Sequence, residues 1–338
     1  MEYRYIGRTG LRVSPICMGT MTFGSQCDEK AAFAIMDKAY EYGVNFFDTA
    51  ELYPVPPTAE LAGLTEEMVG KWLKTKPRES VILATKVAGA ASGWFVPPIR
   101  HGYTACDRFH IERAIEGSLK RLGTDYIDLY QIHWPDMIVP IEETLRTMDT
   151  LVQSGKVRYI GTSNDTARGT MKSLMVSKYE KLSRFESIQN NFSLLNRRDL
   201  TEIGALCREE KISLLPYSPL GGGVLSGKYN QAISSQGRFS DYINSNNKRQ
   251  RLMAARFLND KTLASTQEYL RIASVYGLDP VTMAIAWSKQ FDFVASTIIG
   301  ATTPEQLDAS LAAMNVTLND EILKELDAVH AKILYPMG

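Results

Sequence analysis

The fold of this chain is decided by residues 109–163, which read FHIERAIEGSLKRLGTDYIDLYQIHWPDMIVPIEETLRTMDTLVQSGKVRYIGTS. An amphipathic segment of helical length ends at Gly123, and a strand-like run follows at 126–133. The same pair then recurs, with a helix that ends at Gly155 and a strand at 157–163. Glycine marks a helix end because it adopts the left-handed conformation at little cost. Helices that alternate with short strands predict βαβ units and a parallel sheet.

The alternation continues on both sides of this stretch, and a third helical segment, 29–43, also ends on a glycine. Strand-like runs lie at 13–19, 44–49, 81–87, 126–133, 157–163, 186–190, 212–218 and 296–300. Eight strands that alternate with helices predict a closed (β/α)8 TIM barrel, which takes about 250 residues. We expect the remaining residues in two insertions, 88–107 and 219–260, and in an N-terminal β-hairpin over 2–14 that plugs the bottom of the barrel.

A doubly wound sheet divided between two domains is the alternative architecture. A boundary between domains is usually marked by a change in composition or a flexible linker. The chain has neither a Pro/Gly/Ser-rich linker nor such a change. We therefore expect residues 1–338 to form a single α/β barrel domain with long loops at its C-terminal face.

Charge and cysteine content exclude several classes of protein. The chain has 38 basic and 38 acidic residues, which argues against a nucleic-acid or membrane-surface partner, since both need a positive field. Its four cysteines are widely spaced and form no CxxC pair, so we expect neither a disulfide framework nor a metal site. The sequence has no signal-peptide pattern and no apolar run long enough to span a membrane, which makes the cytoplasm the default location.

Polar side chains follow most of the predicted strands. In a barrel of this kind, chemistry occurs at the C-terminal strand ends, where the loops form the open face. The residues at these ends are Asp48-Thr49 with Glu51 and Tyr53, Lys86, His133-Trp134, Ser163-Asn164, Gln189-Asn190 and Tyr217-Ser218. Each has a possible structural explanation, such as an ion pair in the core. Because all of them converge on one face, a common site explains them better.

Four of these residues, Asp48, Tyr53, Lys86 and His133, make chemical sense as a set. A tyrosine hydroxyl with its usual pKa of about 10 is a poor acid at neutral pH, but a nearby ammonium stabilises the phenolate and lowers that pKa. Asp48 would hold Lys86 charged and oriented, and His133 would donate a hydrogen bond to a carbonyl oxygen. The set predicts an acid that delivers a proton to an oxygen that is becoming an alkoxide.

At these residues the sequence resembles the aldo-keto reductase superfamily, over essentially the whole chain. The motifs that carry the resemblance are FFDTAELY (46–53), LATKV (83–87), DLYQIHWPD (128–136), IGTSN (160–164), Gln189, PYSPLGGGVLSGKY (216–229) and IIGATTPEQL (298–307). Tyr53 is followed by the extended segment PVPPTAELAGLTE (54–66). This segment makes the chain most similar to the branch that contains potassium-channel β subunits and bacterial Tas-type reductases.

The resemblance implies a reductase of aldehydes or ketones that uses NADP(H) without a Rossmann domain. Tyr53 would be the general acid, Lys86 and Asp48 would tune it, and His133 would orient the carbonyl. Tyr217 would stack on the nicotinamide ring. The positions that the resemblance assigns to cofactor binding are Thr20, Met21, Asp48, Ser163, Asn164, Gln189, Tyr217, Ser218, Leu220, Lys228, Arg238, Gly300, Thr302, Gln306 and Ser310.

The chain departs from the family pattern at the adenine end of the cofactor. Where the family usually reads EQLxEN, this chain reads EQLDAS, so the positions that commonly contact adenine are Ala309 and Ser310. Each lost neutral hydrogen bond is worth about 0.5–1.5 kcal/mol, so we expect weaker binding of adenine. Lys228 and Arg238 still favour the extra phosphate of NADPH through their charge.

The loops are expected to select the substrate, a small-molecule carbonyl compound. The three loops concerned are 54–64, 88–107 and 219–245, and the predicted aromatic wall consists of Trp94, Phe95 and Trp134. The alternative function is that of a cofactor-sensing interaction subunit, as in the channel β subunits. Because all four catalytic positions are filled, the sequence favours the enzyme. It carries no indication of an oligomeric state.

Overall fold

The centre of the molecule is a ring of parallel strands. The computed structural model describes residues 2–90, 96–231 and 237–337, so Trp94 and Phe95 lie outside the described residues. The eight-stranded sheet has the order β10-β3-β4-β5-β6-β7-β8-β9. Bridges from Leu214 to Val294 and from Tyr217 to Ile298 join its two ends. The strands are β3 (Ile16–Gly19), β4 (Phe46–Asp48), β5 (Ile82–Val87), β6 (Ile127–Ile132), β7 (Val157–Ser163), β8 (Phe185–Gln189), β9 (Ser213–Leu214) and β10 (Thr297–Ile299).

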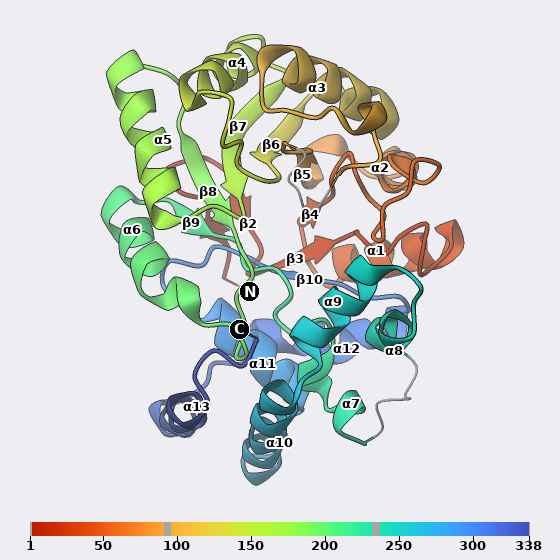
Figure 1. Ribbon diagram of the computed structural model, residues 1–338, viewed down its shortest axis with the longest axis vertical. Helices are drawn as coiled ribbons and strands as arrows, with labels where there is room; N and C mark the ends of the chain where they lie inside the picture. Colours follow the sequence, from red (N-terminus) through yellow and green to blue (C-terminus); the bar gives the residue numbers. More distant parts are fainter. Residues whose placement is uncertain (1, 91–95, 232–236, 338) are drawn as a thin grey trace.

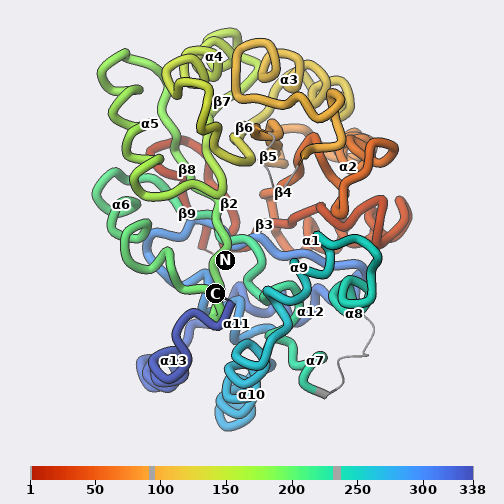
Figure 2. Tube along the Cα trace, viewed as in Figure 1, coloured from red at the N-terminus to blue at the C-terminus, as the bar shows by residue number. Residues whose placement is uncertain are grey.

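Helices follow the strands and lie around the ring, which confirms the predicted (β/α)8 barrel (Figure 1). Three of them, α7, α8 and α9, lie in the predicted insertion 219–260, and the trace in Figure 2 follows this segment away from β9. The helices are α1 (Glu29–Glu41), α2 (Leu64–Leu73), α3 (Arg108–Leu122), α4 (Ile141–Gln153), α5 (Ala167–Glu180), α6 (Glu202–Glu210), α7 (Lys228–Gln231), α8 (Arg238–Ile243), α9 (Lys248–Phe257), α10 (Asp260–Val275), α11 (Pro280–Lys289), α12 (Leu307–Ala312) and α13 (Asp320–Lys332).

The predicted helix ends are confirmed where the sequence places glycine. Gly123 caps α3 in the left-handed conformation, with a φ of 62°. Gly155, just beyond α4, has a φ of 77°. At the other end of α3, the Asp107 side chain accepts a hydrogen bond from the His110 backbone nitrogen. These caps fix where α3 begins and ends and where α4 ends, and thereby the lengths of the loops that lead to β6 and β7.

Two predicted strands are wrong in their extent, and proline explains both. The run 13–19 is divided at Pro15: Val13 pairs with Arg4 in the N-terminal hairpin, and β3 begins only at Ile16. The run 212–218 contributes only the two residues of β9. Proline has no backbone N–H to donate to a sheet, and Pro216 takes part only as an acceptor, from the Ile298 nitrogen at 2.8 Å.

The N-terminal hairpin closes one end of the barrel interior, as predicted. It consists of β1 (Arg4–Tyr5) and β2 (Arg12–Val13), paired antiparallel. Its apolar residues Ile6, Leu11 and Val13 pack in one buried cluster with barrel residues from several strands, namely Cys17, Phe46, Ala84, Leu129 and Leu215. The hairpin therefore fills the interior space that the short strands leave open.

A buried ion pair joins β5 to the two helices that flank it. Glu66 of α2 is fully buried, and its carboxylate accepts hydrogen bonds from Thr85 Oγ1 at 2.6 Å and Arg121 Nε at 2.7 Å. Glycine makes room for this arginine: a Cβ on Gly117 would lie 2.9 Å from Arg121 Nη1. Burial raises the pKa of the Glu66 carboxyl, an effect that Arg121 and Thr85 only partly oppose. The pair links α2, β5 and α3 behind the strand that carries Lys86.

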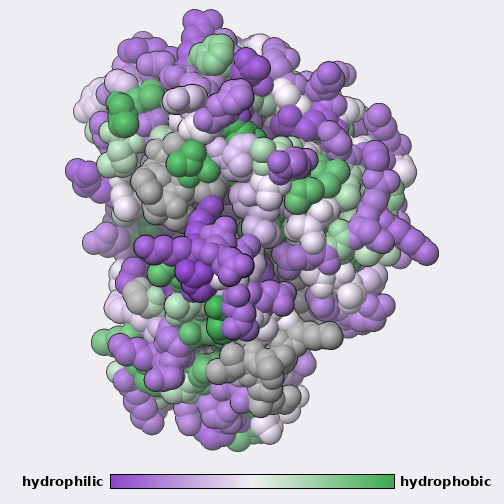
Figure 3. Space-filling view, turned by 45° about the vertical axis from the view of Figure 1, so that its right-hand side comes forward, coloured by the Kyte–Doolittle hydropathy of each residue, from purple (hydrophilic) through white to green (hydrophobic). Residues whose placement is uncertain are grey.

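Hydrophilic residues cover most of the face shown in Figure 3, and hydrophobic residues are scattered over it in small groups. Isolated apolar side chains of this kind are normal on a folded protein. None of the helices in the described ranges combines the length and the apolar composition that crossing a bilayer requires.

Candidate active site

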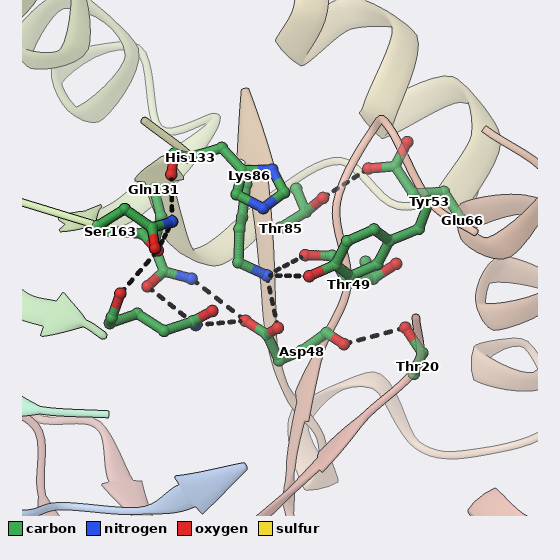
Figure 4. Close-up of polar contacts among 12 residues, drawn as sticks. Thr20, Asp48, Thr49, Tyr53, Glu66, Thr85, Lys86, Gln131, His133 and Ser163 are labelled. Atoms are coloured by element: carbon green, nitrogen blue, oxygen red, sulfur yellow. Dashed lines mark hydrogen bonds and ion pairs between the residues drawn. The ribbon is translucent and has the colours of Figure 1, made fainter. Parts of the chain in front are cut away.

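Polar side chains from neighbouring strands meet at the C-terminal end of the barrel (Figure 4). Asp48 is the last residue of β4, Lys86 lies in β5 and His133 directly follows β6. The register pairs Asp48 with Ala84, which places the aspartate and Lys86 on adjacent strands two positions apart. Tyr53 stands in the loop that leaves β4. The structure thus brings together the four residues that the sequence predicts to be catalytic.

The carboxylate of Asp48 is the centre of this arrangement. It is 2% exposed, and its Oδ1 accepts from Lys86 Nζ at 2.5 Å. Its Oδ2 accepts from Gln189 Nε2 at 2.9 Å and from Gln131 Nε2 at 3.2 Å. Hydrogen bonds to an ionised acceptor are the stronger kind. Three donors therefore fix the orientation of this carboxylate.

Lys86 has no solvent exposure and three oxygen atoms around its ammonium. Besides Asp48, these are the Thr49 carbonyl oxygen at 2.8 Å and the Tyr53 hydroxyl at 3.5 Å. Burial alone would lower the pKa of Lys86, but Asp48 and Tyr53 outweigh it, and the pKa lies above its usual value. The lysine is therefore charged, and that charge points at the tyrosine oxygen.

Tyr53 keeps its proton more firmly than the sequence predicts. Burial raises the pKa of its phenol, and Lys86 lowers it as expected, but the burial effect is larger and the pKa lies above the usual value. The sequence argument had counted only the ammonium, because the burial of the ring is a tertiary property. At neutral pH the hydroxyl is a donor, which is the protonation state of a general acid before reaction.

His133 is buried and neutral. Burial, and then the charge of Lys86, lower its pKa well below the usual value. Its ring is stacked on Trp134 at 3.9 Å between centroids and lies edge-on to the Tyr53 ring at 5.7 Å. Its Nδ1 is buried and has no hydrogen-bond partner among the described residues. A neutral imidazole has one N–H, so His133 can donate one hydrogen bond to a ligand beside Tyr53.

Residues at the ends of β7 and β8 form a connected polar group beside this centre. Ser163 Oγ and the Asn164 nitrogen both donate to the Gln189 carbonyl oxygen, at 2.7 and 3.0 Å. Asn164 adopts a left-handed backbone with a φ of 55°. Its side chain donates to the His133 carbonyl oxygen and accepts from the Tyr217 hydroxyl at 2.7 Å. The predicted nicotinamide residues are thus held in place by each other.

Gln131 is part of the site, and the sequence reasoning missed it. It is fully buried, donates to Asp48, and its Oε1 accepts from Gln189 Nε2 at 3.3 Å. Both N–H groups of the Gln189 amide face Asp48 and Gln131, which leaves the Gln189 Oε1 for other partners. A signal was present: side chains two apart in a strand share a face, so Gln131 had to point the same way as His133.

Lys228 and Arg238 are neighbouring cations of the insertion, and burial lowers the pKa of each. Lys228 and Arg238 form no ion pair within the described part of the chain. Burial, and then Arg238, lower the pKa of Lys228, and burial lowers that of Arg238. A Cβ on Gly237 would lie 2.9 Å from Lys228 Nζ. Two crowded, desolvated cations favour a multivalent anion between them.

The remaining predicted cofactor residues lie in three places. Thr20 is buried, and both its nitrogen and its Oγ1 donate to the Asp48 carbonyl oxygen, while Met21 beside it is half-buried. After β10, the Thr302 nitrogen donates to Gln306 Oε1 at 2.9 Å, and a Cβ on Gly300 would meet open space. Half-buried Ser218 and Leu220 stand at the start of the insertion.

Ser310, the last of the predicted cofactor residues, is buried in α12. It is 2% exposed, and its Oγ lies 3.5 Å from the Gln306 carbonyl oxygen of the preceding turn. The hydroxyl is therefore directed to the backbone of its own helix.

Trp134 is the one described residue of the predicted aromatic wall. It is half-buried, and its ring stacks on His133.

The chain is similar to known proteins over nearly its whole length. The sequence profile of the Aldo/keto reductase family matches residues 15–331. Protein tas of Escherichia coli (strain K12) is 39% identical, with 99% of each chain covered. The uncharacterized oxidoreductase YrpG of Bacillus subtilis (strain 168) is 37% identical, over 97% of this chain and 96% of its own. A probable voltage-gated potassium channel subunit beta of Oryza sativa subsp. japonica is 34% identical, over 97% and 96%.

Proposed function

Because this chain belongs to the Aldo/keto reductase family, we propose that it is an NADP(H)-dependent oxidoreductase that reduces aldehydes or ketones to alcohols, with Tyr53 as the general acid. The observation that carries the proposal is the buried ammonium of Lys86 between Asp48 and the Tyr53 hydroxyl. A structural ion pair would need only the first of these contacts. The second directs a positive charge at the one oxygen that becomes negative when the phenol gives up its proton.

The residues of the site divide the proton chemistry between them. The bound NADPH would supply a hydride to the carbonyl carbon. As the carbonyl oxygen gains negative charge, Tyr53 transfers its proton to it, and Lys86 stabilises the phenolate that remains. His133, being neutral, donates a hydrogen bond to the same oxygen and orients the carbonyl. Asp48 keeps Lys86 charged and in place.

The cofactor proposal rests on the charge of the insertion. Residues 219–260 hold six basic residues against two acids, Asp241 and Asp260, although the whole chain is neutral. NADPH carries a pyrophosphate and a 2′-phosphate, which suit Lys228 and Arg238, two neighbouring cations that burial removes from water. The amide oxygen of Gln189, which the contacts of its N–H groups leave for another donor, suits the carboxamide of a nicotinamide, since that group offers an N–H donor.

Lys228→Met is expected to raise the KM for NADPH about 10- to 100-fold and leave the KM for NADH nearly unchanged, because a charge-assisted hydrogen bond to the extra phosphate is lost. The measurement is steady-state kinetics with both cofactors at a saturating aldehyde. The matched control is Lys172→Met, since Lys172 is exposed on α5 away from the site. A loss of equal size with NADH would contradict the contact with the 2′-phosphate.

The rate of reduction is expected to be flat from about pH 6 to about pH 9 and to fall only at higher pH. Reduction needs the protonated phenol, and burial holds the pKa of Tyr53 above its usual value, so the phenol loses its proton only in strong alkali. His133 adds no inflection near neutrality because burial keeps it neutral. The check is kcat against pH; a decline between pH 6 and pH 8 would assign the acid to another group.

A second candidate function comes from the channel-subunit relatives, of which one is 34% identical over nearly the whole chain. A cofactor-sensing subunit would bind NADPH with similar residues and turn over very slowly. Turnover with a panel of aromatic, aliphatic and sugar aldehydes separates the two functions. Rates on the order of 1 s⁻¹ or above support the enzyme.

A further inference from the structure

Glu51 lies two residues before Tyr53, and the proposed reaction does not use it. Its side chain is 4% exposed, and its carboxylate has three donors. Oε1 accepts from the Ala88 backbone nitrogen at 2.7 Å and from Arg100 Nη2 at 2.8 Å, and Oε2 accepts from Arg100 Nη1 at 2.8 Å. The Glu51 nitrogen also donates to the Lys86 carbonyl oxygen. This one carboxylate thus connects the Tyr53 loop, the end of β5 and a distant loop.

Arg100 brings a strained loop to this contact. Its side chain is only 15% exposed, and both of its terminal nitrogens bind Glu51 in the bidentate geometry that only arginine offers. Arg100 and His101 are consecutive non-glycine residues with left-handed backbones, at φ values of 47° and 55°. Such residues persist only where the surrounding contacts hold them. Backbone hydrogen bonds from Gly102 to Ile99 and from Tyr103 to Arg100 close the turn, and the bidentate ion pair anchors it to Glu51.

The loop held in this way forms one wall of a cleft. The cleft has a volume of about 690 Å³, within the range of small-molecule sites, and residues 96–102 face Ala59 and Ala62 across it. The opposite wall belongs to the loop that follows Tyr53, and the Gly63 nitrogen donates back to the Tyr53 carbonyl oxygen. The lining is mostly apolar, from Ala59, Ala62, Val96, Pro97, Pro98 and Ile99.

We propose that the Glu51–Arg100 ion pair is a clamp that sets the position of the 96–102 wall relative to Tyr53. Asp48, Tyr53, Lys86 and His133 do not line this cleft, so Glu51 and Arg100 are positioning residues for a substrate whose apolar body extends from Tyr53 into it. This inference rests on the proposed function. Within the described residues, the side chains of Glu51 and Arg100 bond to each other and to the Ala88 nitrogen, and not to Asp48 or Lys86. The clamp therefore acts on the binding of the substrate body and not on the proton transfer.

The test compares Arg100→Met, Arg100→Lys and a control, Arg108→Met. Arg108 pairs with Glu112 on the exposed surface of α3, so its removal leaves the clamp intact. The first measurement is hydrogen exchange of the backbone amides at 99–104, which needs no activity. We expect exchange about tenfold faster in Arg100→Met, an intermediate rate in Arg100→Lys and no change in the control.

The second measurement is reduction of a small aldehyde, propanal, and a bulky apolar one, 4-phenylbenzaldehyde. In Arg100→Met the KM for the bulky aldehyde is expected to rise about tenfold, with the KM for propanal and the Kd of NADPH within about twofold of the parent. Arg100→Lys should recover part of the loss. Equal changes for both aldehydes and the cofactor, or unchanged exchange, would overturn the clamp. A parent protein that reduces no carbonyl would contradict the proposed function instead, and the exchange data would still decide whether the clamp exists.

Discussion

Tyr53→Phe is expected to lower the rate of carbonyl reduction by roughly 10²- to 10⁴-fold, the usual contribution of general acid catalysis. The substitution removes a single oxygen atom, which is the atom that Lys86 Nζ approaches at 3.5 Å. The ring remains edge-on to His133, so the shape of the pocket is retained. We expect the Kd of NADPH, measured by fluorescence titration, to stay within about twofold of the parent.

The matched control for this variant is Tyr40→Phe. The Tyr40 hydroxyl donates to Ser80 Oγ at 2.8 Å, and its ring packs against Trp72 among the helices. The control also removes a hydrogen-bonded phenol oxygen, but from a place outside the site. The turnover of Tyr40→Phe should therefore match that of the parent. If Tyr53→Phe retained the parent rate while NADPH still bound, Tyr53 would not be the acid and the proposed mechanism would fail.

Arg121→Met is expected to lower the free energy of unfolding by about 3 kcal/mol, the lower end of the range for breaking a buried ion pair, because Arg121 is 26% exposed. Methionine keeps the length of the stem and removes only the charge. The fully buried Glu66 carboxylate is then left with the hydroxyls of Thr85 and Ser118, which are neutral donors. Urea denaturation monitored by circular dichroism gives the change. Arg108→Met, at an exposed pair, should cost at most about 1 kcal/mol.

The sign of the pH dependence provides a second check of this variant. Burial raises the pKa of Glu66 in the folded protein above that of the unfolded chain, and Arg121 opposes this shift. Without the arginine the raised pKa is unopposed, so the folded state binds a proton more readily than the unfolded state. The destabilisation should therefore shrink as the pH falls from 8 towards 5. A loss independent of pH would indicate a packing defect in place of an unpaired charge.

The sequence predicts much of this architecture because local and periodic signals agree. Glycine ends α3 and α4, and polar residues follow strands whose order along the chain is also their order around the barrel. Asp48, Lys86 and His133 were found because each stands at a strand end. Two strands were predicted too long because the apolar pattern continues through Pro15 and Pro216, where the pairing of the strands is interrupted.

What the sequence did not predict depends on contacts between distant residues. Glu66 and Arg121 are 55 positions apart, and Glu51 and Arg100 are 49 apart. Neither pair has a spacing that a helix or strand would produce. The raised pKa of Tyr53 depends on how completely the surrounding protein excludes water from its ring. These properties follow from the packing of the whole barrel, which no local pattern encodes.

The pairing of β3 with β10 has a consequence for how the protein is made. Ile16 pairs with Thr297, near the opposite end of the chain. A ribosome adds about 5–20 residues per second, so the first barrel strand waits for many seconds before its neighbour has even been synthesised. Until then one edge of that strand has unpaired backbone groups, and the hairpin that plugs the interior has no closed ring to enter. During that interval the unpaired edge of the strand is open to pairing with another molecule.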